Sequence, residues 1–205
     1  MSKTFPMFQD RAGLERIVLF SDAVMAIAIT LLVLDLRAPD SPHGLVRALL
    51  ALWPSYLSYL FSFFIIGSYW LSHHRLFRPI VRYDDRLAVL NLGFLFFIAL
   101  IPFSTKLIAL TLTGRAAVVV YSLNILPLGL ISTALGRHAY KDNRLLDPAC
   151  DPAEVRRHLD FSRRGLVVFL ICLTVSVAFP AAFLPVWVLG FLSRSLGRRL
   201  WKVRW

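Results

Sequence analysis

The chain has 205 residues, of which 58% are apolar, 17% are charged and 13% are aromatic, and its formal net charge is +11. A soluble domain of this length has about a quarter of its residues charged, so this chain has too few charges to cover a surface that faces water. The high apolar content excludes a disordered chain, and two cysteines are too few for a disulfide framework or a four-cysteine metal site. The composition therefore predicts an integral membrane protein.

Six apolar stretches are candidates for membrane-spanning helices, which predicts an all-α membrane protein. A hydrocarbon core about 30 Å thick needs roughly 20 helical residues. The stretches comprise residues 17–34, 45–72, 87–110, 116–135, 166–179 and 181–193. The last two are short and are interrupted by Pro180 and Pro185. They are compatible with a tight hairpin or with one long kinked helix.

The distribution of basic residues favours six spans with both termini in the cytoplasm. With six spans, 19 of the 23 Lys and Arg residues lie on one side of the membrane, as expected for the cytoplasmic side. A five-span topology removes most of this bias. The same pattern explains the net charge, so we expect no nucleic-acid partner. We predict one six-helix domain over residues 1–205, with a helix that begins near Asp151 and a basic segment, residues 198–205, that lies against anionic lipid.

The first predicted span contains an acidic residue, Asp22. A carboxylate inside a membrane span costs several kcal/mol unless it is paired or hydrated. At about 100° per residue, Asp22, Ala26 and Thr30 lie on a small and polar face, which suits close packing against neighbouring helices. Asp22 is therefore predicted either to face a pore or to belong to a buried polar network.

Large aliphatic side chains occupy another face of the same span. Ile27, Leu31 and Leu34 lie across the helix from Asp22. Periodicity alone leaves two interpretations, and it favours simple contact with lipid. In the second, the three side chains form rings that constrict a pore in an oligomer and act as a hydrophobic gate.

Polar residues near the ends of the next two spans are predicted to meet Asp22. Trp70, His73 and His74 end the second span and Asn91 lies about one turn into the third, and opposite span directions place them at the depth of Asp22. The paired histidines could bind metal, relay protons or hydrogen-bond to neighbouring helices. Metal is the weakest of these because no Cys, Asp or Glu stands one helical turn away. We therefore predict an inter-helix polar network and no metal site.

These residues together resemble a known family. Arg16-x-x-x-Phe20-Ser21-Asp22, followed by Ala26-Ile27-x-Ile29-Thr30-Leu31-Leu32, then Trp70-x-x-His73-His74, Asn91 and Pro102-Phe103, is similar to the single-repeat prokaryotic members of the transmembrane protein 175 potassium-channel family. The resemblance covers the first three predicted spans, about half of the chain. Ala23 and Met25 stand where many relatives carry Gly and Phe.

The resemblance implies a homotetramer in a prokaryotic plasma membrane, with a central pore lined by the first span and no cofactor. It assigns the pore constriction to rings of Ile27, Leu31 and Leu34, and so favours the pore over lipid contact. It also implies that a polar network holds the first span in place, comprising Arg16, Ser21, Asp22, Trp70, His73, His74 and Asn91. The expected function is passive, potassium-preferring conduction.

Two alternatives and one excluded class complete the prediction. His73, His74 and Asp22 can titrate at membrane depth, so a proton-permeable channel is an alternative. A secondary cation transporter would usually show two related halves, and no convincing repeat relates residues 1–100 to residues 101–205. No nucleophile and base pair recurs among the spans, so an enzyme is not expected.

Overall fold

A computed structural model describes residues 11–36, 44–111, 114–151, 167–183 and 185–190. Over these ranges the chain is almost entirely helical. The elements are α1 (Arg11–Val33), α2 (Leu45–Ala51), α3 (Trp53–Phe77), α4 (Asp85–Ala99), α5 (Ile101–Thr111), α6 (Arg115–Ala139), the short 3-10 turns η1 (Lys141–Asn143) and η2 (Pro180–Ala182), and the apolar helix Val167–Ala178.

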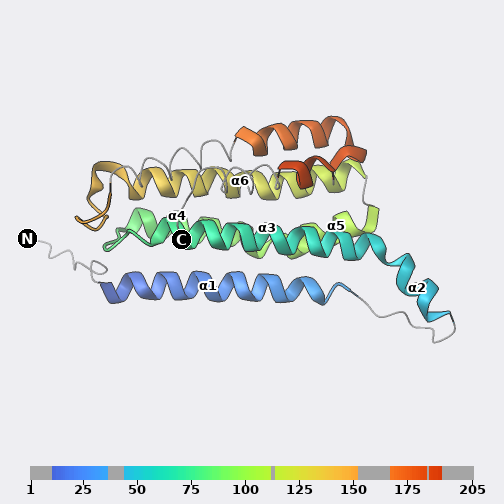
Figure 1. The fold of residues 1–205 in the computed structure, drawn as a ribbon, viewed down its shortest axis with the longest axis horizontal. Coiled ribbons are helices and arrows are strands. Elements are labelled where there is room, and N and C mark those ends of the chain that lie inside the picture. Colours follow the sequence, from blue (N-terminus) through green and yellow to red (C-terminus); the bar gives the residue numbers. More distant parts are fainter. Residues whose placement is uncertain (1–10, 37–43, 112–113, 152–166, 184, 191–205) are drawn as a thin grey trace, which may run out of the picture.

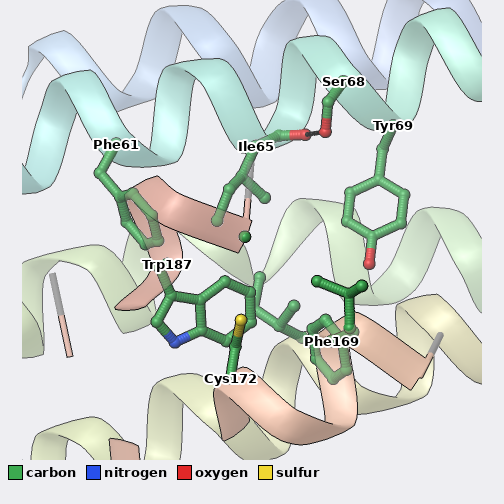
Figure 2. Close-up of a pocket in the computed structure, with 10 residues that line it drawn as sticks. Phe61, Ile65, Ser68, Tyr69, Phe169, Cys172 and Trp187 are labelled. Atoms are coloured by element: carbon green, nitrogen blue, oxygen red, sulfur yellow. Dashed lines mark hydrogen bonds between the residues drawn. The ribbon is translucent and has the colours of Figure 1, made fainter. Parts of the chain in front are cut away.

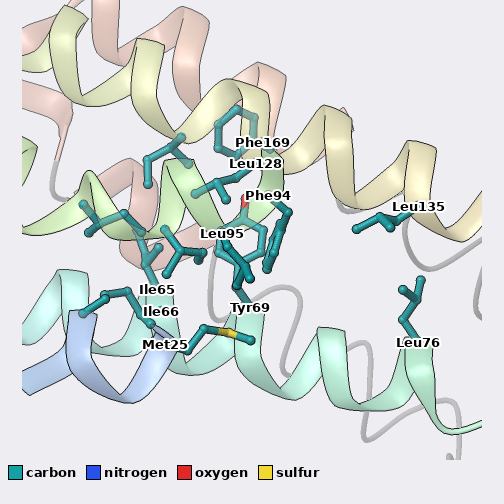
Figure 3. Packing of buried hydrophobic residues seen from close by; sticks show 14 of the residues in the cluster. Met25, Ile65, Ile66, Tyr69, Leu76, Phe94, Leu95, Leu128, Leu135 and Phe169 are labelled. Carbon is teal, nitrogen blue, oxygen red and sulfur yellow. The ribbon is translucent and has the colours of Figure 1, made fainter. Parts of the chain in front are cut away.

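The long helices lie side by side, with α1 along one edge of the bundle (Figure 1). α1 packs against α3, α4 and α5, whereas α6 packs against α4 and α5 from the other side. The buried core fills the space between these helices, and Figure 3 shows Met25 of α1 beside Ile65, Ile66 and Tyr69 of α3. Within the part of the chain that the structure describes, α1 therefore contacts the other helices with one side only.

Two prolines coincide with breaks in the helices. α2 and α3 are bent by 50° around Leu52, two residues before Pro54, and α4 gives way to α5 at Leu100, two residues before Pro102. A proline lacks the N–H that would bond one turn back, and its ring clashes with the carbonyl there. The second and third predicted spans each consist of two helical pieces for this reason.

The described residues include three helices that are long and apolar enough to cross a membrane, or four if α2 and α3 form one bent span. These correspond to the first four predicted spans, with small shifts at their ends. α1 begins six residues before predicted residue 17, and α3 continues five residues beyond predicted residue 72. The helix Val167–Ala178 is shorter than a span, so the total of six spans stays a prediction.

The fifth and sixth apolar stretches fold back on each other. Trp187 Nε1 donates a hydrogen bond to Ser176 Oγ at 3.1 Å, and Cys172 Sγ lies 3.6 Å from the carbonyl oxygen of Val186. These contacts correspond to the hairpin and not to a single kinked helix. Figure 2 shows Phe61 of α3, Trp187 and Cys172 among the residues that line a small apolar cavity.

Three sequence predictions fall outside the described residues. They are the helix expected to begin near Asp151, which would occupy residues 152–166, the basic segment 198–205, and the end of the sixth predicted span at residues 191–193.

Candidate pore helix and polar network

One face of α1 is packed into the bundle. Its buried residues are spaced by seven, four, three and four positions, which follows one side of a helix. They are Leu14, Ser21, Met25, Ala28 and Leu32. In the most apolar 18-residue stretch of α1, only 22% is buried. The corresponding stretches of α4–α5 and of α6 are each 44% buried. α1 is thus the least enclosed of these three candidate spans.

Two predicted constriction residues lie on the side of α1 that the described residues leave uncovered, and the third, Leu34, directly follows the end of the helix. Ile27 is 58% exposed, Leu31 is 43% exposed and Leu34 is 71% exposed. The large aliphatic face therefore faces away from α3, α4 and α5. In a single chain this face is available either to lipid or to other copies of the chain.

Among the described residues, Ala26 and Thr30 of the small face of α1 do not pack against another helix of this chain, and close packing against a helix of another copy stays a prediction. Ala26 and Thr30 are exposed, and the Thr30 hydroxyl bonds to the carbonyl of Ile27 in its own helix at 2.9 Å. Only Asp22 of this face is directed to another helix. The packed face of α1 instead contains Ser21, whose hydroxyl accepts a hydrogen bond from the buried amide of Asn91 on α4.

A chain of hydrogen bonds joins α1, α4 and α3 through three buried side chains. Asn91 Nδ2 donates to Ser21 Oγ at 2.9 Å, and Ser21 Oγ donates to the carbonyl of Ile17 at 2.8 Å. His73 Nε2 lies 2.8 Å from Asn91 Oδ1. Since that amide oxygen can only accept, the ring donates from Nε2. Asn91 thus uses both ends of its side chain to connect the other two helices.

The imidazole of His73 is held by its faces as well as by this bond. It stacks on Phe77 with ring centroids 4.3 Å apart and on Phe94 at 5.6 Å. Its buried Nδ1 has no hydrogen-bond partner in the part of the chain that the structure describes. His73 therefore serves as a packed hydrogen-bond donor to Asn91.

A second contact holds the same turn of α1 to α3. Trp70 Nε1 donates to Asp22 Oδ1 at 2.9 Å, and the Trp70 ring stacks on His74 at 6.0 Å. Ser21 and Asp22 are consecutive, so both contacts fix one position along α1. The structure therefore brings together six of the seven predicted network residues, in two adjacent sets.

Arg16 is the residue that the structure does not bring to the others. It is exposed on α1, and no hydrogen bond or ion pair joins it to the network within the described ranges. Six positions separate Arg16 from Asp22, which turns the arginine by about 240° around the helix. It lies on the uncovered side, together with the aliphatic residues.

Sequence reasoning missed a second buried polar cluster, which joins α3, α5 and α6. Thr105 Oγ1 lies 2.7 Å from Ser62 Oγ, which lies 3.1 Å from the hydroxyl of Tyr121, and Asn124 Nδ2 donates to Ser104 Oγ at 3.0 Å. We call these five residues the scaffold cluster. Asn124, a lone amide in an apolar helix, was the available signal, because such residues usually bond to another helix.

A third polar group lies where α4 begins. The carboxylate of Asp84 accepts from the amide of Leu87 at 2.9 Å, from His138 Nε2 at 2.8 Å and from Arg144 at 2.6 Å. Burial acts to raise the pKa of Asp84, but the Leu87 amide, His138 and Arg144 together outweigh it and lower the pKa below its ordinary value. This group joins the ends of α4 and α6.

The described residues contain no group of three or more His, Cys, Asp or Glu side chains that could hold a metal ion. The polar groups at the site are instead arranged in hydrogen-bonded pairs and short chains.

Comparisons with known proteins show the family to which the chain belongs. Residues 16–102 match the family described as endosomal/lysosomal potassium channel TMEM175. A Streptomyces collinus protein named as a potassium channel is 39% identical over 189 residues, which cover 89% of this chain and 90% of that protein. This chain belongs to the TMEM175 family.

Two further matches show the range of that family. The crystal structure of a lysosomal potassium-selective channel TMEM175 homolog from Chamaesiphon minutus superposes with a TM-score of 0.79 at 34% identity, and covers 90% of this chain and 97% of that chain. A chicken relative named as an endosomal/lysosomal proton channel is 38% identical over 103 residues, which are 45% of this chain and 21% of that protein. The TMEM175 family is a family of ion channels and not an enzyme class, and membership in this family identifies the chain as a multi-pass membrane protein.

Proposed function

We propose that this TMEM175 protein is a potassium-preferring cation channel, a homotetramer in a prokaryotic plasma membrane with α1 lining the central pore. The main support is the contrast between the two sides of α1. One side packs on α3, α4 and α5, while the other leaves Ile27, Leu31 and Leu34 uncovered. The relatives from Streptomyces collinus and Chamaesiphon minutus, with their potassium-channel names, support the choice of ion.

The proposed constriction works by size and by loss of water. Rings at positions 27, 31 and 34 would be spaced by about 6 Å and 4.5 Å along α1. Aliphatic side chains offer no oxygens to replace the hydration shell of an ion, so a narrow ring loses water and blocks conduction. Conduction then requires the rings to move apart until a hydrated or partly hydrated cation passes.

The polar network would hold the pore helix at a fixed position while its other face forms the pore. Asn91 and Trp70 bond to consecutive residues of α1, Ser21 and Asp22. In a membrane, apolar packing alone gives little preference for one helix rotation, because lipid is as apolar as the side chains. Hydrogen bonds to two neighbouring residues define both the rotation and the depth of α1.

Flux from proteoliposomes tests this function. Purified protein is reconstituted with a potassium gradient and then a sodium gradient, with valinomycin as the control for full potassium permeability. We expect potassium flux to exceed sodium flux, and we expect Ile27→Asn and Leu31→Ser to raise flux and reduce the preference for potassium. Val89→Ser, on an exposed position of α4, is the matched control. Unchanged flux in both α1 variants would refute the pore assignment.

Proton permeation is the second candidate, and it is supported by the name of the chicken relative together with the titratable side chains around α1. The same vesicles, loaded with a pH-sensitive dye, distinguish the two. A pH change that follows a proton gradient and persists without potassium would favour proton conduction. Its absence, with potassium flux present, would favour the potassium channel.

A further inference from the structure

An ion pair joins the C-terminal end of α1 to α5. Lys106 Nζ lies 3.3 Å from Asp35 Oδ1. Asp35 directly follows Leu34, the last of the proposed constriction residues, and Lys106 is the one charged residue of α5. A charged residue next to a membrane span is costly unless it finds a partner or water. The ion pair is therefore a specific structural contact between the end of α1 and α5.

Asp35 is coupled to the constriction residues by a tight turn. The amide of Leu34 bonds to the carbonyl of Leu31 at 3.1 Å, and the amide of Leu36 bonds to the carbonyl of Val33 at 3.0 Å. These three-residue steps close the helix more tightly than α-helical bonds do. A displacement of Asp35 would therefore also move Leu34 and Leu31.

Lys106 projects from a part of α5 that is itself fixed. The neighbouring Thr105 lies 2.7 Å from Ser62 of α3 through its hydroxyl, within the scaffold cluster. Thr105 is buried, whereas the side chain of Lys106 is 51% exposed and that of Asp35 is 29% exposed. Asp35 is thus attached to a fixed point of the scaffold by a partly hydrated ion pair.

Between this pair and the network at Ser21 and Asp22, α1 contacts the bundle through apolar side chains. The described residues of α1 and its final turn make side-chain hydrogen bonds or ion pairs to other helices at Ser21, Asp22 and Asp35. Asp22 and Asp35 are about 20 Å apart along the helix axis. The proposed constriction lies between these two attachments.

We propose that Asp35 and Lys106 form a second tether, which positions the Leu31–Leu34 end of the pore helix. The proposal rests on the proposed function, because it assigns the tether to the constriction of that pore. Asp35 and Lys106 are positioning residues, since they act through Leu34.

The direction in which two substitutions change potassium flux distinguishes a tether from a simple effect of charge at the pore entrance. If the pair acts as a tether, Asp35→Asn and Lys106→Met break the same contact and change potassium flux in the same direction. If the two charges act through their electric fields, removal of the negative charge lowers the local cation concentration and removal of the positive charge raises it. The two variants would then change flux in opposite directions.

We would measure potassium flux in proteoliposomes for both single variants, the double variant and the charge exchange Asp35→Lys with Lys106→Asp. A partly exposed ion pair predicts changes of about two- to fivefold in each single variant. We expect the double variant to match the single variants and the exchange to return flux toward that of the unaltered protein. Opposite signs, or no change in either single variant, would overturn the tether.

A spectroscopic measurement keeps the tether testable if the pore assignment fails. A nitroxide is attached at Leu34→Cys, in a background where Cys150 and Cys172 are replaced by serine. We expect Asp35→Asn to increase the mobility of this label and to leave a label at Ile27→Cys unchanged. An unchanged spectrum at both positions would overturn the tether. Unaltered flux in both Ile27→Asn and Leu31→Ser would instead refute the pore assignment, whatever the label shows.

Discussion

Two buried polar groups in this bundle have similar chemistry but connect different parts of it. The network of Ser21, His73 and Asn91 joins α1 to α3 and α4. The scaffold cluster joins α3, α5 and α6 to one another, with no contribution from α1. Both are built from hydroxyls and an amide buried among apolar helices.

The difference shows which contacts are expected to influence conduction. If α1 lines the pore, the network at Ser21 fixes the moving or gating element against the scaffold, whereas the scaffold cluster maintains the scaffold itself. Loss of either should lower stability. Loss of the network alone should also alter ion flux, because it frees the rotation of α1.

The largest effect is expected from Asn91→Ala. It leaves the hydroxyl of Ser21 and the ring of His73 buried without their shared partner, which costs about 2–3 kcal/mol of stability. We expect a lower midpoint of thermal unfolding and altered potassium flux. Asn124→Ala is the matched control, because it removes the amide of the scaffold cluster, where Ser104 keeps a bond to the carbonyl of Ile101 just as Ser21 keeps its bond to the carbonyl of Ile17. A control variant that altered flux as strongly as Asn91→Ala would remove the distinction between the two groups.

A smaller effect is expected when single donors are removed and the rings are kept. Trp70→Phe takes away the N–H that reaches Asp22, and because this hydrogen bond is exposed to solvent it contributes about 1 kcal/mol. Tyr121→Phe takes away the hydroxyl near Ser62, worth about 1 kcal/mol. We expect only the Trp70 variant to change flux per tetramer, measured after both proteins are shown to be intact oligomers. Equal flux in the two variants would contradict this prediction.

The smallest effect concerns Asp84, which belongs to neither group. Asp84→Asn keeps a side chain that caps α4 but removes the charge that faces His138 and Arg144, which predicts a loss of about 1 kcal/mol or less. Potassium flux should not change.

The direction of the pKa shift determines how the stabilisation by Asp84 depends on pH. The pKa of Asp84 is lowered in the folded protein, so its stabilisation is present above the ordinary value of 3.8 and is lost as pH falls through the lower folded value. The midpoints of thermal unfolding of the unaltered protein and of Asp84→Asn should therefore become equal at pH values below that range. A difference that persisted at low pH would show that the charge is not the cause.

Much of the fold could be predicted from the sequence because hydropathy and length define helices in a membrane protein. The first four apolar stretches correspond to α1, α2 with α3, α4 with α5, and α6. The contacts of Asp22, His73 and Asn91 could also be anticipated, since alternate span directions place these residues at one depth. A polar side chain in such an environment needs a partner.

Two features could not be derived in this way. The packed face of α1 carries Ser21, Met25, Ala28 and Leu32, while larger aliphatic residues are uncovered. In lipid, apolar residues gain little from burial, so the bulkiest stripe does not mark the packed face. The scaffold cluster was hidden because serine and threonine can bond to a carbonyl of their own helix, as Ser104 and Thr105 also do.

The most direct test of the central claim is whether a charged thiol reagent blocks conduction from positions on α1. Cys150 and Cys172 are replaced by serine, and single cysteines are introduced at Ile27, Leu31 or, as a control, at the exposed Val89 of α4. We predict that a methanethiosulfonate reagent reduces potassium flux through the Ile27→Cys and Leu31→Cys variants and leaves Val89→Cys unaffected. Full flux through both modified α1 variants, with labelling verified by mass, would contradict a pore lined by α1.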